Sequence, residues 1–97
     1  MRILPPAAEY LESIGKRERG RIYDDIQTVR RGNFTKVRTK QLKGEIRELI
    51  RGKHRISYFK IAATLYFVRG FAKKSQKTPK KEIEYAEQVL QKIQTML

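Results

Sequence analysis

Apolar side chains recur with helical spacing in two N-terminal segments, and together these segments predict a helical hairpin with one buried face. The two stripes consist of apolar residues three or four positions apart, namely Ala7, Leu11 and Ile14, then Ile22, Ile26 and Val29. Pro5 and Pro6 precede the first stripe, and proline is tolerated in the first turn of a helix. Gly15 ends the first helix, and Gly32-Asn33 ends the second, which runs from about residue 17 to residue 30.

The pattern changes in the middle of the chain, where isoleucine, tyrosine, phenylalanine, valine and threonine predominate and favour strands. We expect the three strands of an antiparallel meander at about residues 45–51, 54–60 and 64–70. Gly52-Lys53 forms the first turn, and Ile61-Ala62-Ala63 forms a second with a weaker signal. Alternation along the second strand places Ile56 and Tyr58 on one face and Arg55 on the other, so that Arg55 is expected to face solvent.

A polar loop follows Ala72, and Thr78 and Pro79 are an N-cap and a first helical residue suited to start a last helix. Its apolar stripe consists of Ile83, Ala86, Leu90, Ile93 and Leu97, with acidic residues near the start, where the helix dipole favours anions. Residues 2–4 are a candidate edge strand. The sequence therefore predicts an α+β fold with two N-terminal helices, a small antiparallel sheet of three to four strands and a C-terminal helix. A length of 97 residues suits one domain, spanning residues 1–97.

Charge is distributed unevenly along the chain. The formal net charge is +13, and residues 36–81 carry fifteen basic and two acidic side chains, so the whole excess lies in the middle. A localised cationic surface indicates a polyanionic partner, above all nucleic acid, although an acidic protein partner fits the charge equally well. The chain has no cysteine, no signal-peptide core and no apolar run of the roughly 20 residues that cross a bilayer. We therefore expect a cytoplasmic protein without membrane contact.

Several chemistries do not fit this sequence. His54 is the one histidine, and the carboxylates are too scattered to form a two-metal site, so we expect neither a metal nor a cofactor. RNA can nevertheless be cleaved when its own 2′-hydroxyl attacks the adjacent phosphate. Arginine and lysine stabilise the charge that develops on the phosphate, and crowding of cations pushes a lysine pKa toward the range of a base. A site rich in lysine and arginine is therefore chemically suited to cleave RNA.

One run of residues closely resembles a signature of phage-derived HigB-like toxins, which belong to the RelE/ParE superfamily. The run reads Arg69-Gly70-Phe71-Ala72-Lys73-Lys74-Ser75-Gln76-Lys77-Thr78-Pro79. Upstream, Lys43-Gly44 with Glu48-Leu49, and the strand that begins at Arg55, resemble two strands of that family. The resemblance implies an endoribonuclease toxin that cleaves mRNA, commonly in the ribosomal decoding site, and inhibits translation. It also implies a cognate antitoxin, usually a helix-turn-helix repressor encoded beside the toxin.

The resemblance also implies site residues. Arg55 matches the strand arginine that faces substrate, and Lys73, Lys74 and Lys77 match the basic loop. This chain departs from the family pattern at Arg69, which replaces a histidine, at His54, which replaces a tyrosine, at Ser75, which replaces a threonine, and at Ile50, which replaces an arginine. Arg51 is a candidate substitute for that arginine if a bulge re-aims it. The candidate catalytic residues are Arg55, Lys73, Lys74, Lys77 and Arg51. A second group of residues that could take part in catalysis consists of His54, Arg47, Tyr58 and Arg69.

The other cations of the middle region are expected to bind RNA backbone: Lys36, Arg38, Lys40, Lys43, Lys53 and Lys80. For Tyr58 and Phe71, packing in the core is the favoured interpretation. Three functions stay open: a metal-independent ribonuclease acting on the ribosome, a gyrase-poisoning toxin of the same fold, and a non-enzymatic RNA-binding or ribosomal protein. The cationic loop favours the first.

Overall fold

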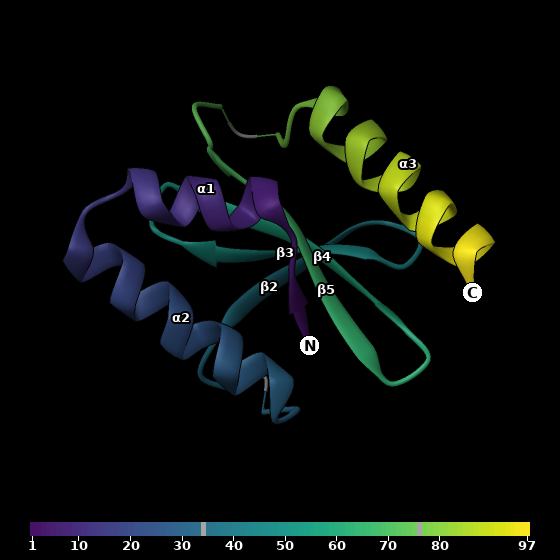
Figure 1. Ribbon diagram of the computed structural model, residues 1–97. Helices are drawn as coiled ribbons and strands as arrows, with labels where there is room; N and C mark the ends of the chain where they lie inside the picture. Colours follow the sequence, from purple (N-terminus) through teal and green to yellow (C-terminus); the bar gives the residue numbers. More distant parts are fainter. Residues whose placement is uncertain (34, 76) are drawn as a thin grey trace.

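A computed structural model describes residues 1–33, 35–75 and 77–97 (Figure 1). The elements are β1 (Arg2–Ile3), α1 (Pro5–Ser13), α2 (Lys16–Arg30), β2 (Arg38–Lys43), β3 (Ile46–Arg51), β4 (His54–Ile61), β5 (Thr64–Ala72) and α3 (Lys80–Met96). The strands form one five-stranded sheet in the order β1-β5-β4-β3-β2. Strand β1 pairs parallel with β5, and the other neighbours pair antiparallel. The α+β class, the helical hairpin, the meander and the C-terminal helix are thereby confirmed.

The sheet has five strands instead of the expected three to four, and it is mixed instead of antiparallel, because β1 runs parallel to β5. The additional strand β2 is polar except for Leu42, and only Thr39 and Leu42 in it are partly buried. Such a strand lacks the alternation of apolar and polar residues on which sequence-based detection depends. It is recognised as a strand because it pairs with β3 at the edge of the sheet. The candidate edge strand at residues 2–4 does form, and its neighbour is β5.

Helices cover both faces of the sheet (Figure 1). On one face, the apolar stripes of α1 and α2 pack on side chains such as Leu49, Ile56 and Phe67. On the other face, Ala86 of α3 packs on Ile46, Phe59 and Val68. Burying apolar residues on both faces stabilises the sheet between the helical layers.

The second covered face overturns the expectation that Arg55 faces solvent. Arg55 lies on the α3 side of β4, and its side chain is only 13% exposed. The expected N-cap of α3 is also wrong, because Pro79 occupies the cap position and the Thr78 hydroxyl bonds to Glu48 instead. Leu97, assigned above to the apolar stripe of this helix, is 80% exposed.

A β-bulge in β5 determines which side chains face α3. Ser57 pairs with Arg69 and Tyr58 pairs with Phe67, so Val68 is the extra residue. The bulge places Val68 and Arg69 on the same side of the sheet, where strict alternation would have sent them to opposite sides. Val68 consequently packs in the cluster around α3, and Arg69 reaches Glu82 in the first turn of that helix.

Gly70 allows α1 to lie close against β5. A Cβ atom at this position would lie within 2.7 Å of three carbon atoms of Tyr10, including its Cβ. Tyr10 cannot easily move aside, because its hydroxyl oxygen lies 2.6 Å from Nδ1 of His54. The glycine is therefore required by packing and not by backbone conformation.

Replacing Gly70 by alanine should lower the free energy of unfolding by about 1–3 kcal/mol, because overpacking displaces Tyr10 and the α1 backbone. Gly20→Ala is the matched control, since Gly20 lies within α2 and has open space around its Cβ position. It should raise stability by roughly 0.5–1 kcal/mol, the helix-propensity difference between the two residues. Urea denaturation measures both, and a Gly70→Ala protein as stable as the parent would contradict this account of the packing.

Candidate nucleic-acid cleft

The strand register gathers cationic segments at one end of the sheet. Arg51 at the end of β3 pairs with His54 at the start of β4, and His54 pairs with Ala72 at the end of β5. Arg38 at the start of β2 pairs with Ile50, next to the same turn. The Gly52-Lys53 turn, the loop after Ala72 and the start of β2 therefore meet, although they are far apart in the sequence.

A shallow cleft of about 540 Å³ lies at this end of the sheet. Its lining consists of Gly52, Lys53, Arg55, Lys73, Lys74 and Ser75. The backbone N–H of Lys73 donates to the carbonyl of Lys53 at 2.8 Å, which joins the start of the loop to the turn. The structure thus brings together Arg55, Lys73 and Lys74 from the candidate catalytic set. Lys77 is an exposed residue further along the same loop and does not line the cleft.

The guanidinium group of Arg55 is held by the turn beneath it. Its Nη1 donates to the carbonyl oxygens of Gly52 at 2.6 Å and of His54 at 3.0 Å. Its Nε lies 3.7 Å from Oε1 of the fully buried Glu48. A guanidinium that is held on several sides presents its charge in a defined direction, as the binding of a phosphate requires.

Arg51 points away from this cleft. It extends from the opposite face of the sheet and forms a two-pronged pair with Asp25 of α2, at 2.8 and 2.7 Å. This pairing raises the pKa of Arg51, against the smaller opposing effect of burial. The register between β3 and β4 is continuous here, so the bulge that would re-aim Arg51 is absent.

Arg47 and Tyr58 belong to a different part of the molecule. Together with Thr39 and Lys60 they line a hollow of about 450 Å³ toward the other end of the strands. Arg47 donates to the Thr39 hydroxyl at 3.1 Å. Tyr58 is 3% exposed and stacks on Phe67, as expected for a core residue, and Phe71 is likewise buried.

His54 faces the helical hairpin, on the side of β4 opposite Arg55. It is buried, with Nδ1 against the Tyr10 hydroxyl and Nε2 3.8 Å from a carboxylate oxygen of Glu18. Burial lowers the pKa of His54, and Lys53 and Arg55 act in the same direction, while Glu18 opposes them. The ring is therefore neutral near pH 7 and joins α1 to the sheet.

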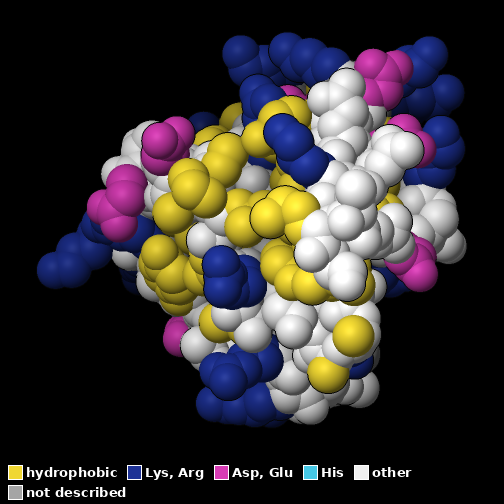
Figure 2. Space-filling model, turned by 45° about the vertical axis from the view of Figure 1, so that its right-hand side comes forward, with side chains coloured by type: hydrophobic (Ala, Val, Ile, Leu, Met, Phe, Trp, Pro, Cys, Tyr) yellow, Lys and Arg dark blue, Asp and Glu magenta, His cyan; other side chains and the backbone are white. Residues whose placement is uncertain are grey.

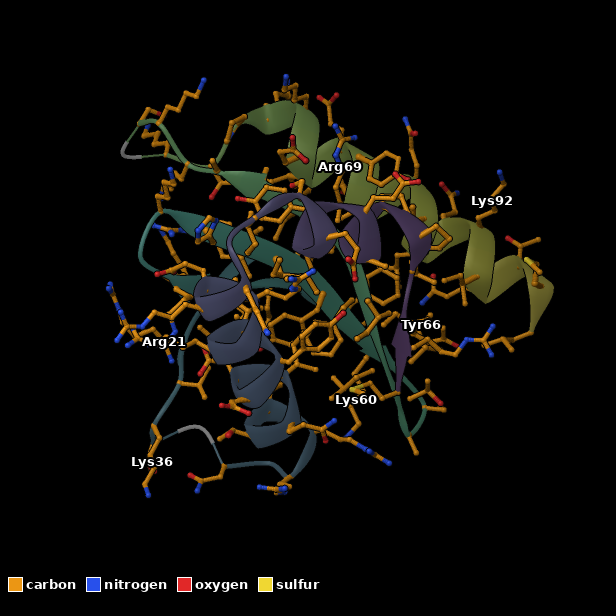
Figure 3. All side chains as sticks on the ribbon, turned by 60° about the vertical axis from the view of Figure 1, so that its left-hand side comes forward. Arg21, Lys36, Lys60, Tyr66, Arg69 and Lys92 are labelled. Atoms are coloured by element: carbon orange, nitrogen blue, oxygen red, sulfur yellow. The ribbon has the colours of Figure 1, made fainter. Side chains whose placement is uncertain are left out.

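Arg69 points toward the start of α3 (Figure 3). Its Nε lies 3.3 Å from Oε1 of the buried Glu82, and its guanidinium carbon lies 4.9 Å from the centre of the Tyr85 ring. These contacts attach α3 to β5. Sequence reasoning overlooked Glu48 and Glu82 as partners of arginine. The available signal was that Glu48 shares a strand face with the apolar Ile46 and Ile50.

The expected RNA-binding cations divide into two groups. Lys36 and Arg38 border a small hollow of about 250 Å³ that includes Gly52, beside the cleft, and Lys53 lines the cleft itself. The others lie elsewhere: Lys40 is exposed on β2, while Lys43 pairs with Glu87 at 2.9 Å and Lys80 with Glu84 at 3.8 Å. Figure 2 shows lysine and arginine side chains gathered along the upper edge of the molecule, above a central area of hydrophobic side chains.

Among residues 1–33, 35–75 and 77–97, no three histidine, cysteine, aspartate or glutamate side chains are placed to hold a metal ion together. No helix within those same ranges has the length and apolar character needed to span a membrane.

The chain belongs to the phage-derived Gp49-like family (DUF891), whose sequence profile matches residues 9–91. No curated protein matches the chain significantly in sequence. Among solved structures, the chain is similar to one from the RelB-RelE antitoxin-toxin complex of Methanococcus jannaschii. The TM-score is 0.65 at 18% sequence identity, over 87% of this chain and 95% of that chain. This similarity shows a RelE-type fold.

The pair between Arg51 and Asp25 should stabilise the fold. Arg51→Met leaves the Asp25 carboxylate buried without its partner, so the free energy of unfolding should fall by about 1–3 kcal/mol. Asp25→Asn should also destabilise, and the double variant should lose less than the sum of the two, as expected for residues in direct contact. Urea denaturation of the four proteins measures the coupling. Strictly additive losses would show that the two side chains do not interact in solution.

The lowered pKa of His54 makes stability depend on pH. The unfolded chain takes up a proton near pH 6.5 and the folded protein only at lower pH, so stability falls as pH decreases through this window. Urea denaturation at about pH 7.5 and pH 5.5 should show a smaller loss in His54→Gln than in the parent. Glu18→Gln should enlarge the loss, because Glu18 favours the charged ring. An unchanged pH dependence in His54→Gln would refute the assignment.

Proposed function

We propose that this protein is the toxin of a type II toxin-antitoxin system, an endoribonuclease of the HigB-like branch that cleaves mRNA on the ribosome and inhibits translation. The observation that carries the proposal is the cleft in which Arg55 lies with Lys53, Lys73 and Lys74. Membership of the Gp49-like family and the RelE-type fold support the toxin class and an antitoxin partner. The cytoplasm, where ribosomes translate, is the corresponding location, and residues 1–97 act as one toxin domain.

The residues of the cleft suit cleavage by the 2′-hydroxyl of the RNA itself. The 2′ oxygen forms a bond to phosphorus, the bond from phosphorus to the 5′ oxygen breaks, and the products are a 2′,3′-cyclic phosphate and a 5′-hydroxyl end. Arg55 stabilises the charge on the non-bridging oxygens in the transition state. The cleft lysines bind the flanking phosphates, and general acid-base catalysis removes the 2′ proton and delivers a proton to the 5′ leaving oxygen.

The cations beside the cleft extend the surface along which RNA can lie. Lys36 and Arg38 are continuous with the cleft through Gly52, since this residue lines both hollows. The remaining cations then make weaker contacts with ribosomal RNA or bind the antitoxin, namely Lys40, Lys43 and Lys80. We propose a helix-turn-helix antitoxin, encoded beside the toxin, that keeps the protein inactive until it is removed.

The chemistry of the RNA ends tests this function. After induction of the toxin in growing cells, mRNA should be cut within translated regions, leaving 5′-hydroxyl and cyclic phosphate ends, which 2′-hydroxyl attack produces. Arg55→Ala should lower the cleavage rate by roughly 10²–10³-fold, the usual effect of losing one donor to a transition-state oxyanion. Arg2→Ala is the matched control, because Arg2 is exposed on β1 and pairs with Tyr66, away from the cleft.

Other outcomes favour the other functions. Growth arrest with intact mRNA and accumulated gyrase-DNA breaks would favour a gyrase poison of the same fold. Normal growth with stable RNA binding would favour a non-enzymatic RNA-binding protein. Ends bearing a 5′-phosphate would contradict 2′-hydroxyl attack even if mRNA is cut.

A further inference from the structure

The buried carboxylate of Glu48 has no role in the chemistry described so far. Glu48 is 0% exposed and lies on β3 facing α3, on the same face as the apolar Ile46. Burying a carboxylate costs several kcal/mol, and an apolar residue of similar volume is often at least as stable in such a position. A carboxylate at this position therefore points to a role in placing its two partners, Arg55 and Thr78.

The first partner is the strand arginine of the cleft. Oε1 of Glu48 lies 3.7 Å from Nε of Arg55, longer than a hydrogen bond, and neither atom has a hydrogen-bond partner among the described residues. The attraction therefore acts through charge, while the carbonyls of Gly52 and His54 hold Nη1. Together these three acceptors restrict how the guanidinium can turn.

The second partner belongs to the loop that carries the lysines. The Thr78 hydroxyl donates to Oε2 of Glu48 at 2.9 Å. In its position before Pro79, a threonine commonly caps the following helix, yet here α3 has no side-chain cap. The other end of the loop is fastened where the Lys73 N–H bonds to the Lys53 carbonyl. Lys74 and Lys77 thus lie between two attachments to the sheet, one at Lys73 and one at Thr78, and Glu48 provides the second.

We propose that Glu48 is a positioning residue for the cleft. Its charge aligns Arg55, and its bond to Thr78 fixes the lysine loop, the segment between β5 and α3 that carries Lys73, Lys74 and Lys77. Glu48 itself does not touch RNA, because its side chain is fully buried. The inference rests on the proposed function, since it concerns the residues that would act on the scissile phosphate. The cleft has two parts, one from β4 and one from the loop, and the same Glu48 carboxylate contacts both of them.

Kinetics of the purified protein on ribosome-bound mRNA tests the inference. Thr78→Val keeps the shape of the side chain but not its hydroxyl. It should lower kcat by roughly tenfold or more, because a small displacement of the loop lysines from the scissile phosphate slows the reaction. KM should change less than about threefold, since every lysine that binds backbone phosphate remains. Thr78→Ser restores the hydroxyl and should restore most of kcat.

Two variants at glutamate positions complete the kinetic set. Glu48→Gln retains an acceptor for Thr78 but not the charge beside Arg55, and should lower kcat with KM nearly unchanged. Glu45→Gln is its matched control, because Glu45 is an exposed carboxylate just before the same strand, and it should behave like the parent. A Thr78→Val protein with the parent's kcat, or a loss that Thr78→Ser does not reverse, would overturn the inference.

A second measurement separates failure of this inference from failure of the proposed function. Backbone amide hydrogen exchange of the loop, followed by NMR, does not require cleavage. Thr78→Val should speed exchange at Lys73 and shift the Arg55 Nε–H resonance, while the exchange of β4 and β5 core amides stays slow. Such changes in a protein that does not cut RNA would support the positioning role and reject the ribonuclease. Unchanged exchange and an unchanged Arg55 resonance would reject the positioning role.

Discussion

Charges buried between the sheet and the start of α3 constrain much of this structure. Glu48 and Glu82 are almost fully buried, and a buried carboxylate is tolerated when a cation or a donor faces it. Glu48 lies beside the Arg55 guanidinium and accepts a hydrogen bond from Thr78, and Glu82 lies beside the Arg69 guanidinium. The segment after β5 must therefore return across the α3 face at a particular place. The lysine loop connects β5 to α3, so its course follows from these pairs.

Successive side chains of β4 point to opposite faces of the sheet and make different kinds of contact there. His54 and Ile56 face the helical hairpin, where the neutral ring of His54 joins Tyr10 and apolar packing predominates. Arg55 and Ser57 face α3, where Arg55 lies beside the buried carboxylate of Glu48 and the Ser57 hydroxyl donates to the Arg69 carbonyl. The histidine and the arginine are neighbours in the sequence but lie on opposite sides of the sheet. They therefore cannot act together on one phosphate, although sequence reasoning could consider both for the same site.

The bulge at Val68 has a comparable effect on Arg69. If side chains alternated strictly through Val68, Arg69 would lie on the side of the hairpin, beyond reach of Glu82. With it, the arginine lies over the Tyr85 ring and helps to attach α3. A histidine precedes Gly-Phe in the signature that this run resembles, whereas the arginine found here is committed to a contact with the helix. The residue that departs from the pattern, Arg69, thus makes a structural contact with Glu82 and Tyr85.

The sequence by itself determined the helical hairpin, the meander, the α3 helix and the cationic middle region, because periodicity and composition are local properties. Its resemblance to a family signature also made Arg55, Lys73 and Lys74 candidate site residues, and the strand register brings these three to one cleft. Only the tertiary structure decided that Arg51 pairs with Asp25, that β2 is a strand, and that Glu48 lies between Arg55 and Thr78. Each of these depends on contacts between segments that are distant in the sequence, and neither spacing nor residue type specifies which partner a buried charge will find.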